Sequence, residues 1–192
     1  MAERLGQWLH VAEAIRLHAA QGQLAAAARL GLRRQPAGLQ QQLQQELDRL
    51  RAAMTRSIRT VDPAHRPDPN DLDTEFALYH QRLNDLQRRM EMGVDALRQH
   101  VRQQVALVNP ELATLDAVMD PLLAGREQRL LTSLPSFLRA RFVELQQQAA
   151  ETASSEPLDW LQAFSAEFEQ LLLAELDLRL LPVVGLIESL DP

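Results

Sequence analysis

Apolar residues recur about once per helical turn through residues 72–108, and this spacing constrains the fold more than any other feature of the sequence. The ten steps between successive apolar positions average 3.6 residues, which is the repeat of a straight α-helix. A strict repeat of 3.5 residues would instead indicate a left-handed supercoil. We therefore predict one long helix over 72–108. Its apolar positions are Leu72, Phe76, Tyr79, Leu83, Leu86, Met90, Val94, Leu97, Val101, Val105 and Val108.

Local signals predict where the neighbouring helices begin and end. Residues 39–61 repeat the apolar spacing, and a loop with three prolines follows over 62–73. Asp71 or Asp73 is the predicted N-cap of the long helix, and Pro110 is predicted to open the next one. Pro121 is expected either to kink that helix or to start a new one after Asp120.

Two further helices are predicted in the C-terminal half. One follows Ser133, with Pro135 in its first turn. The other begins after a loop at 151–157, with Ser155 or Asp159 as its cap, and we expect Pro182 to stop or turn it.

No segment alternates in the manner of a β-strand, so the sequence predicts an all-α protein. We expect a helical bundle of about six or seven helices with the long helix 72–108 at its centre. A helix of that length implies an elongated body or a bend at Gly93. The chain is read as one domain, 1–192, with a possible N-terminal helical subdomain at 1–61, a loop at 62–71 and a main bundle at 72–192.

Composition excludes several chemistries. The chain has no cysteine, and all 20 of its basic residues are arginine, so thiolate, Schiff-base and P-loop lysine chemistry are absent. No Glu-x-x-His, His-Glu-x-x-His or Gly-rich phosphate loop occurs. His10 and His18 lie eight residues apart and could share a helix face, but two histidines alone are too few ligands for a metal site. We predict no catalytic residues, no metal and no cofactor.

The charge is strongly segregated along the chain. Residues 29–66 hold eight arginines against three acidic residues, and residues 143–192 hold ten acidic residues against Arg179 alone. The basic segment could contact nucleic acid, the acidic C-terminal helix or an acidic partner. We favour the helix or an acidic partner over nucleic acid, because the segment lacks interleaved aromatic residues and the whole chain carries a net charge of −6.

The most apolar stretch, residues 171–187, has two readings after a membrane span is excluded. Three charges in its middle are too costly for the bilayer interior. It carries more leucines than one core-facing stripe can bury, which indicates an interface with a partner or a second copy. Phe164, Phe168, Leu171 and Leu172 are assigned to the core. The predicted interface residues are Leu178, Leu180, Leu181, Val183 and Val184, with Glu175, Asp177 and Arg179 as rim charges.

Four stretches together resemble a known family. They are residues 4–20, 79–98, 115–145 and 160–190, and the most distinctive run is Ala174-Glu175-Leu176-Asp177, followed by Arg179, Pro182 and Gly185. The chain resembles an uncharacterised proteobacterial family, domain of unknown function 3348. The resemblance implies a role beside MotA-type and OmpA/MotB-like proteins in an envelope-spanning assembly. It supplies no catalytic residues.

These observations predict a non-enzymatic helical adaptor or scaffold. We expect it in the cytoplasm, because the N-terminus lacks a signal peptide and the chain lacks cysteine. Its partner would be a protein or a second copy of itself, bound through the C-terminal segment without direct membrane insertion. Two alternatives stay open, a nucleic-acid-associated protein that uses residues 29–66 and an enzyme without a recognised motif.

Overall fold

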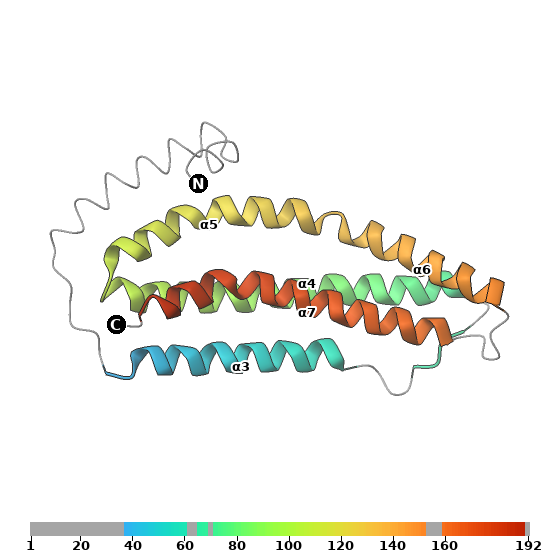
Figure 1. Cartoon of the computed structure of the whole chain (residues 1–192), viewed down its shortest axis with the longest axis horizontal. Coiled ribbons are helices and arrows are strands. Elements are labelled where there is room, and N and C mark those ends of the chain that lie inside the picture. Colours follow the sequence, from blue (N-terminus) through green and yellow to red (C-terminus); the bar gives the residue numbers. More distant parts are fainter. Residues whose placement is uncertain (1–36, 61–64, 69–70, 153–158, 191–192) are drawn as a thin grey trace. The chain divides into compact units, whose positions relative to one another are not determined.

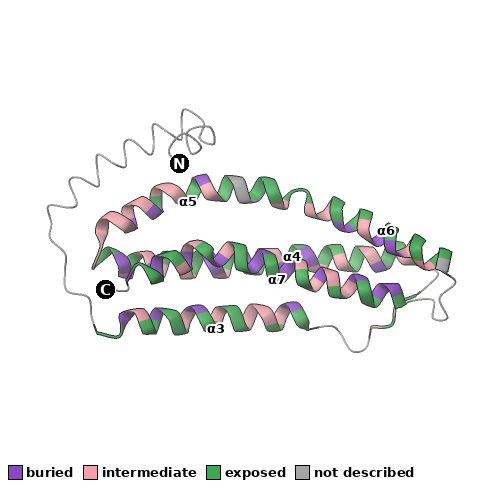
Figure 2. Cartoon of the chain, in the orientation of Figure 1, coloured by how far each residue is buried: buried purple, intermediate pink, exposed green. Residues whose placement is uncertain are grey.

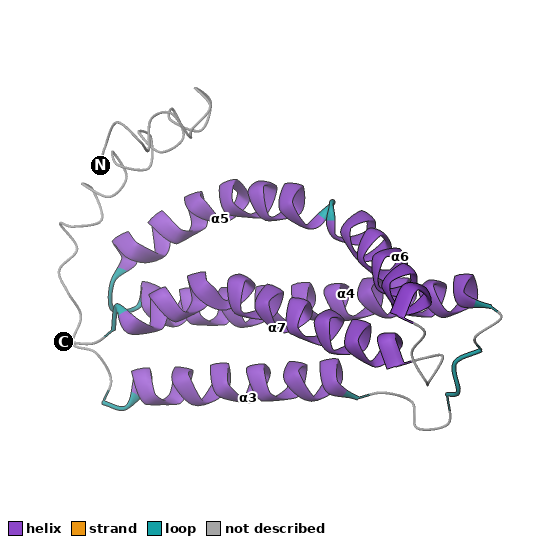
Figure 3. Ribbon diagram, turned by 45° about the vertical axis from the view of Figure 1, so that its right-hand side comes forward, coloured by secondary structure: helices purple, strands orange, loops and turns teal. Residues whose placement is uncertain are grey.

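The protein is all-α. The computed structural model describes residues 37–60, 65–68, 71–152 and 159–190, and this part of the chain contains helices and loops but no strand (Figures 1 and 3). The described residues form five helices, against the six or seven predicted for the whole chain. The helices are α3 (Leu39–Arg59), α4 (Leu72–Ala106), α5 (Pro110–Leu131), α6 (Leu134–Thr152) and α7 (Asp159–Glu188).

The long helix α4 starts where the capping pattern predicted. Of the two candidate caps, Asp71 is the one used: its Oδ1 accepts the backbone N–H of Thr74 at 3.2 Å, and its Oδ2 accepts the Thr74 hydroxyl at 2.7 Å. The helix ends at Ala106, two residues before the predicted end. Leu83 is fully buried and Leu97 is half-buried, so the face of α4 that was predicted to be apolar is the face that lies against the core.

Helices α5 and α6 also begin at their predicted signals. Pro110 is the first residue of α5, and the side chain of Asn109 before it accepts the N–H of Leu112 at 3.1 Å. Pro135 is the second residue of α6. Pro121 neither ends α5 nor opens a new helix, because α5 continues through it to Leu131.

Of the two predicted effects of Pro182, to stop or to turn the last helix, the first is wrong. Helix α7 continues through Pro182 to Glu188. A proline inside a helix costs about 3 kcal/mol, whereas each large aliphatic side chain that becomes buried contributes about 1.5–3 kcal/mol. Four such side chains lie beyond the proline and are at most 3% exposed, so their burial outweighs its cost. They are Val183, Leu186, Ile187 and Leu190.

The chain divides into two compact units, each built from separate segments. Unit 1 comprises Met1–Leu47, Ala96–Arg129 and Pro182–Pro192, and unit 2 comprises Asp48–Asp95 and Leu130–Leu181. Helices α3, α4 and α7 each contribute to both units. The boundary therefore does not coincide with the predicted division into 1–61 and 72–192.

Aromatic side chains form the core of unit 2. The Phe142 ring of α6 lies 5.3 Å from that of Phe76 in α4, and 4.9 and 5.0 Å from those of Trp160 and Phe164 in α7, all edge-to-face. Phe168 and Leu172 are buried as predicted, whereas Leu171 is only half-buried. The core of unit 1 is aliphatic, with buried residues of α3, α4, α5 and α7 (Figure 2): Leu39, Leu43, Leu47, Val101, Val105, Ala113, Leu122, Val183, Leu186 and Ile187.

Candidate functional site

The predicted interface residues separate into a buried group and an exposed group. Leu180 and Val183 are 0% exposed, so their assignment to a partner-facing surface is wrong. At 100° per residue, Leu180 follows Leu172 and Leu176 on the buried face of α7, and the buried Val183 continues that face because the helix does not end at residue 182.

The exposed group consists of leucines on the opposite face of the same helix. Leu178 is 45% exposed and Leu181 is 60% exposed, as the prediction required. Val184 is half-buried. Helix α7 thus has a core face and a separate outer face that also carries large apolar side chains.

Two of the predicted rim charges, Glu175 and Arg179, form a largely buried ion pair with each other. Glu175 is buried, and its carboxylate accepts hydrogen bonds from Arg179 at 2.9 Å and from the Gln87 side chain of α4 at 3.0 Å. This arrangement neutralises a buried charge and ties α7 to α4 within unit 2. Asp177 is exposed and lies 3.5 Å from Arg51 of α3.

Three acidic residues of α7 are paired with arginines of other helices. Arg59 of α3 donates to Glu169 at 2.9 Å, and Arg141 of α6 donates twice to Glu167 at 2.6 Å. The bonds to Arg141 lower the pKa of Glu167 below its usual value. The pairs of Arg59 with Glu169 and of Arg51 with Asp177 agree with the prediction that the basic segment lies against the acidic helix.

Five residues of α7 make up what we call the outer stripe. Their steps of three, four, three and four residues average 3.5, the spacing of a seam that contacts another helix. Every member except the half-buried Leu171 is exposed, and two members are small. The outer stripe consists of Leu171, Ala174, Leu178, Leu181 and Gly185.

Packing inside the described fold does not require the glycine in the outer stripe. A Cβ atom at Gly93 of α4 would lie 3.1 Å from Leu50 Cδ1, so that glycine permits the close approach of α3 and α4. A Cβ atom at Gly185 would meet nothing within 4 Å. Glycine inside a helix is less stable than alanine by about 1 kcal/mol, and no neighbour within the described fold accounts for this one.

A cavity of about 240 Å³ beside the start of α4 is a second candidate site. Glu75, only 4% exposed, holds its Oε2 2.9 Å from His65 Nε2, and its Oε1 accepts the Asp68 N–H at 3.2 Å. A histidine oriented by a carboxylate can move a proton. The one hydroxyl of a Ser or Thr in the lining, that of Thr60, donates to the Arg56 carbonyl at 2.8 Å. The lining residues are Thr60, His65, Pro67, Glu75, Leu78, Tyr79 and Arg82.

Arg82 of this lining has a structural task. Its Nη2 donates to the carbonyl oxygens of Ile58 and Thr60, at and just after the end of α3, the latter at 3.0 Å. Burial lowers the pKa of the Arg82 guanidinium, although Tyr79 and Glu169 act in the opposite direction. The ionic groups of this cavity therefore hold the end of α3 and the loop 65–68 in place.

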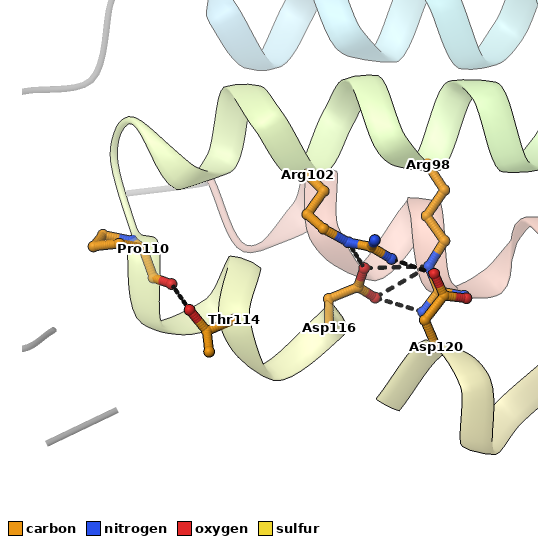
Figure 4. Close-up of polar contacts among 6 residues, drawn as sticks. All are labelled: Arg98, Arg102, Pro110, Thr114, Asp116 and Asp120. Carbon is orange, nitrogen blue, oxygen red and sulfur yellow. Dashed lines mark hydrogen bonds and ion pairs between the residues drawn. The ribbon is translucent and has the colours of Figure 1, made fainter. Parts of the chain in front are cut away.

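Four charged side chains form a largely buried tetrad between α4 and α5 in unit 1 (Figure 4). Arg98 contacts Asp116 and Asp120 at 2.6 Å each, and Arg102 contacts the same two carboxylates at 2.6 and 2.5 Å. Hydrogen bonds to Asp120 and Asp116 raise the pKa of Arg102 against the opposing effect of burial. Each carboxylate oxygen accepts at least one of these bonds, so the tetrad fixes the register of two helices rather than presenting a reactive group.

The described residues hold neither a group of metal ligands nor a membrane-spanning helix. Across residues 37–60, 65–68, 71–152 and 159–190, no three His, Asp or Glu side chains are grouped as a metal ion would need. Among the described helices, none combines the length and the apolar composition that crossing a bilayer requires. The histidines of the N-terminal segment, His10 and His18, lie outside the described residues.

The family model described as "Protein of unknown function (DUF3348)" matches residues 1–192. The chain belongs to this family. No curated protein and no solved structure matches it. The run from Ala174 to Gly185, on which the resemblance to DUF3348 rested most, contains four of the five residues of the outer stripe.

The tetrad of this DUF3348 chain was missed in the sequence, although a signal for it exists. Arg98 and Arg102 are four residues apart, and so are Asp116 and Asp120. The two pairs lie at equal distances from the turn at Asn109, so a helical hairpin brings opposite charges together. Ala174 and Gly185 were not predicted as interface residues, because an apolar periodicity is defined by large side chains.

Proposed function

We propose that this DUF3348 protein is a non-enzymatic helical scaffold that assembles with other proteins through the outer stripe of α7. The observation that carries the proposal is the exposed seam itself. Leu178 and Leu181 lie one turn apart on a face that the described fold leaves open, at 45% and 60% exposure. Covering them would remove further apolar surface from water at about 25 cal/mol per Å².

The spacing of the outer stripe specifies the shape of what binds there. Residues three and four apart align along a helix at 3.5 residues per turn, which is how one helix of a two-stranded coiled coil presents its seam. The small side chain of Ala174 and the bare backbone at Gly185 allow a neighbouring helix to approach closely. We therefore propose that a helix occupies the stripe.

The family resemblance supports a setting for this scaffold. It implies an envelope-spanning assembly of the MotA and OmpA/MotB type, in which this chain would be a cytoplasmic accessory subunit. A helix on the cytoplasmic side of such an assembly, or a second copy of this chain, has the form that the outer stripe accepts.

Site-specific cross-linking in the native host tests the proposal. A photoreactive amino acid at Leu181 should yield a cross-linked protein adduct, and mass spectrometry should place the adduct on a helical segment. The matched control is Met92, which is 68% exposed on α4 and lies off the stripe. If Leu181 gave no more cross-linked product than Met92, the outer stripe would not be an assembly surface.

A paired substitution gives an independent readout. Replacing Leu178 and Leu181 together by Glu should abolish the adduct formed from a probe at Ala174. The double variant should keep the helical circular dichroism spectrum of the wild type, because both leucines are exposed. Retention of the adduct in a folded double variant would refute the proposed surface.

A further inference from the structure

We infer that the outer stripe of α7 is occupied by α7 of a second copy of this chain, running antiparallel, with Leu178 of both copies at the twofold axis. The inference rests on the proposed function, because it names the partner of the same surface. It follows from the order of large and small residues along the stripe.

The sequence of side-chain sizes is self-complementary in this arrangement. With Leu178 opposite Leu178, the antiparallel register places Leu171 of one copy opposite Gly185 of the other. The next layer places Ala174 within one residue, about 1.5 Å along the axis, of Leu181 of the other copy. Each outer layer then joins one leucine to one small residue, which favours interdigitation of the two helices.

A parallel pair would not fill the same space. It would place Gly185 opposite Gly185 and Ala174 opposite Ala174, which leaves gaps between the layers of paired leucines. Unfilled space at a packed contact is destabilising because the surrounding atoms lose their contacts. The antiparallel order therefore gives each small residue a leucine as its neighbour, whereas the parallel order leaves the small residues facing one another.

The exposed glycine is the second observation. A helix former at Gly185 would stabilise α7, and a Cβ atom there would meet nothing within 4 Å among the described residues of one chain. In the antiparallel pair this position receives Leu171 of the second copy. The partner thus supplies a steric reason for a glycine that the described part of one chain does not supply.

The proposed interface is short, and its length determines the protein concentrations at which association should be measured. From Leu171 to Gly185 the stripe spans 14 residue steps, or about 21 Å of helix. A contact of this length is at the small end of specific interfaces, so association should be weak and dependent on concentration. Measurements need to cover roughly 1 μM to 1 mM.

Analytical ultracentrifugation of the full chain is the first test. The weight-average mass should rise from 21.7 kDa toward twice that value as concentration increases. Leu178→Glu, at the twofold axis, should hold the mass at the monomer value throughout. Met92→Glu should associate like the wild type. A wild-type mass that stays at 21.7 kDa over the whole range would overturn the inference.

Glycine substitutions test the close approach. Gly185→Gln should weaken association at least tenfold, because its side chain occupies the space of Leu171 of the second copy. The matched control is Gly125→Gln on α5, where a Cβ atom also meets nothing within 4 Å. Equal association constants for the two variants would contradict the proposed packing.

Cysteine cross-linking determines the orientation, and the chain contains no native cysteine. Ala174→Cys and Leu181→Cys are prepared as separate, differently tagged proteins and oxidised after mixing. The antiparallel pair predicts disulfides between the two variants in excess of disulfides within each. A parallel pair predicts the reverse, and that result would overturn the inference.

The two proposals fail in different ways. If the probe at Leu181 reacts with another protein while the chain stays monomeric, the scaffold proposal stands and the second copy is excluded. If the probe forms no specific adduct and the chain stays monomeric, both proposals fall. Adducts between two copies of this chain, together with mixed disulfides, support both.

Discussion

A single carboxylate fixes where α4 begins. Asp71 accepts two hydrogen bonds from Thr74, and these bonds hold the pKa of Asp71 below its usual value. A group whose pKa is lower in the folded than in the unfolded state stabilises the fold above its unfolded pKa, and this contribution is lost as pH falls through the folded pKa.

The pH dependence of Asp71 can be isolated with its amide analogue. Asp71→Asn keeps the capping oxygen but removes the titration. The melting temperature of the wild type, relative to Asp71→Asn, should therefore be constant at neutral pH and fall as pH drops below about 4. Thermal scans at a series of pH values measure this difference. Parallel curves for the two proteins down to pH 2 would contradict the assignment.

The tetrad of α4 and α5 gives a residue-scale prediction of larger size. Arg98→Ala leaves Asp116 and Asp120 with one arginine in a largely buried site, and breaking a buried pair in this way costs about 3–5 kcal/mol. Urea denaturation should show that loss. The control is Arg59→Ala, which breaks an exposed pair with Glu169 and should change the unfolding free energy much less.

At the scale of the element, the two faces of α7 should respond oppositely to truncation. Ile187→Ala removes a side chain that is 1% exposed and should cost about 2–5 kcal/mol. Leu181→Ala, on the outer stripe of the same helix, should stay within about 0.5 kcal/mol of the wild type at monomeric concentrations. Similar losses for both would mean that the outer stripe is covered within one chain.

Local sequence rules predicted the starts of helices better than the course of α7. Capping residues and prolines located the starts of α4, α5 and α6, because each start is fixed by a few neighbouring atoms. Pro182 was misjudged because the same kind of rule ignores burial. The apolar period through Leu176, Leu180, Val183 and Ile187 continued past the proline and was the better guide.

The candidate site was only partly predictable for a related reason. Periodicity predicted that α7 has more apolar surface than one stripe can bury, and Leu178 and Leu181 are exposed, as a partner-facing position requires. Periodicity did not separate these two leucines from Leu180, because which face of α7 is buried depends on how the helix is rotated about its own axis. That orientation depends on contacts such as the one between Glu175 and Gln87, which are 88 residues apart.

At the scale of the whole molecule, the shared helices predict cooperative unfolding. Residues 72–95 of α4 belong to unit 2 and residues 96–106 to unit 1, and α7 is divided at Pro182. Both helices continue across the division between the units. Unfolding of one unit therefore also unfolds part of a helix that the other unit shares. Val101→Ala in unit 1 and Phe164→Ala in unit 2 should therefore each shift one common transition.

Two probes can check this cooperativity. Circular dichroism reports on all helices, and the fluorescence of Trp160 reports on unit 2 once Trp8 is replaced by Phe. The two denaturation curves should coincide for the wild type and for both variants. A fluorescence transition that precedes the loss of helix in Val101→Ala or Phe164→Ala would show that the units unfold separately.

The discontinuous make-up of unit 1 also has a consequence for synthesis on the ribosome. Its core needs residues from Pro182 onward, so it cannot close until the ribosome has added the end of α7. At about 5–20 residues per second, the 82 residues between the end of α4 at Ala106 and the end of α7 at Glu188 take roughly 4–16 s to add. Throughout that interval the nascent chain carries Val101 and Val105 without the α7 residues that complete their unit. We expect a nascent chain in this state to bind chaperones that recognise exposed apolar helices.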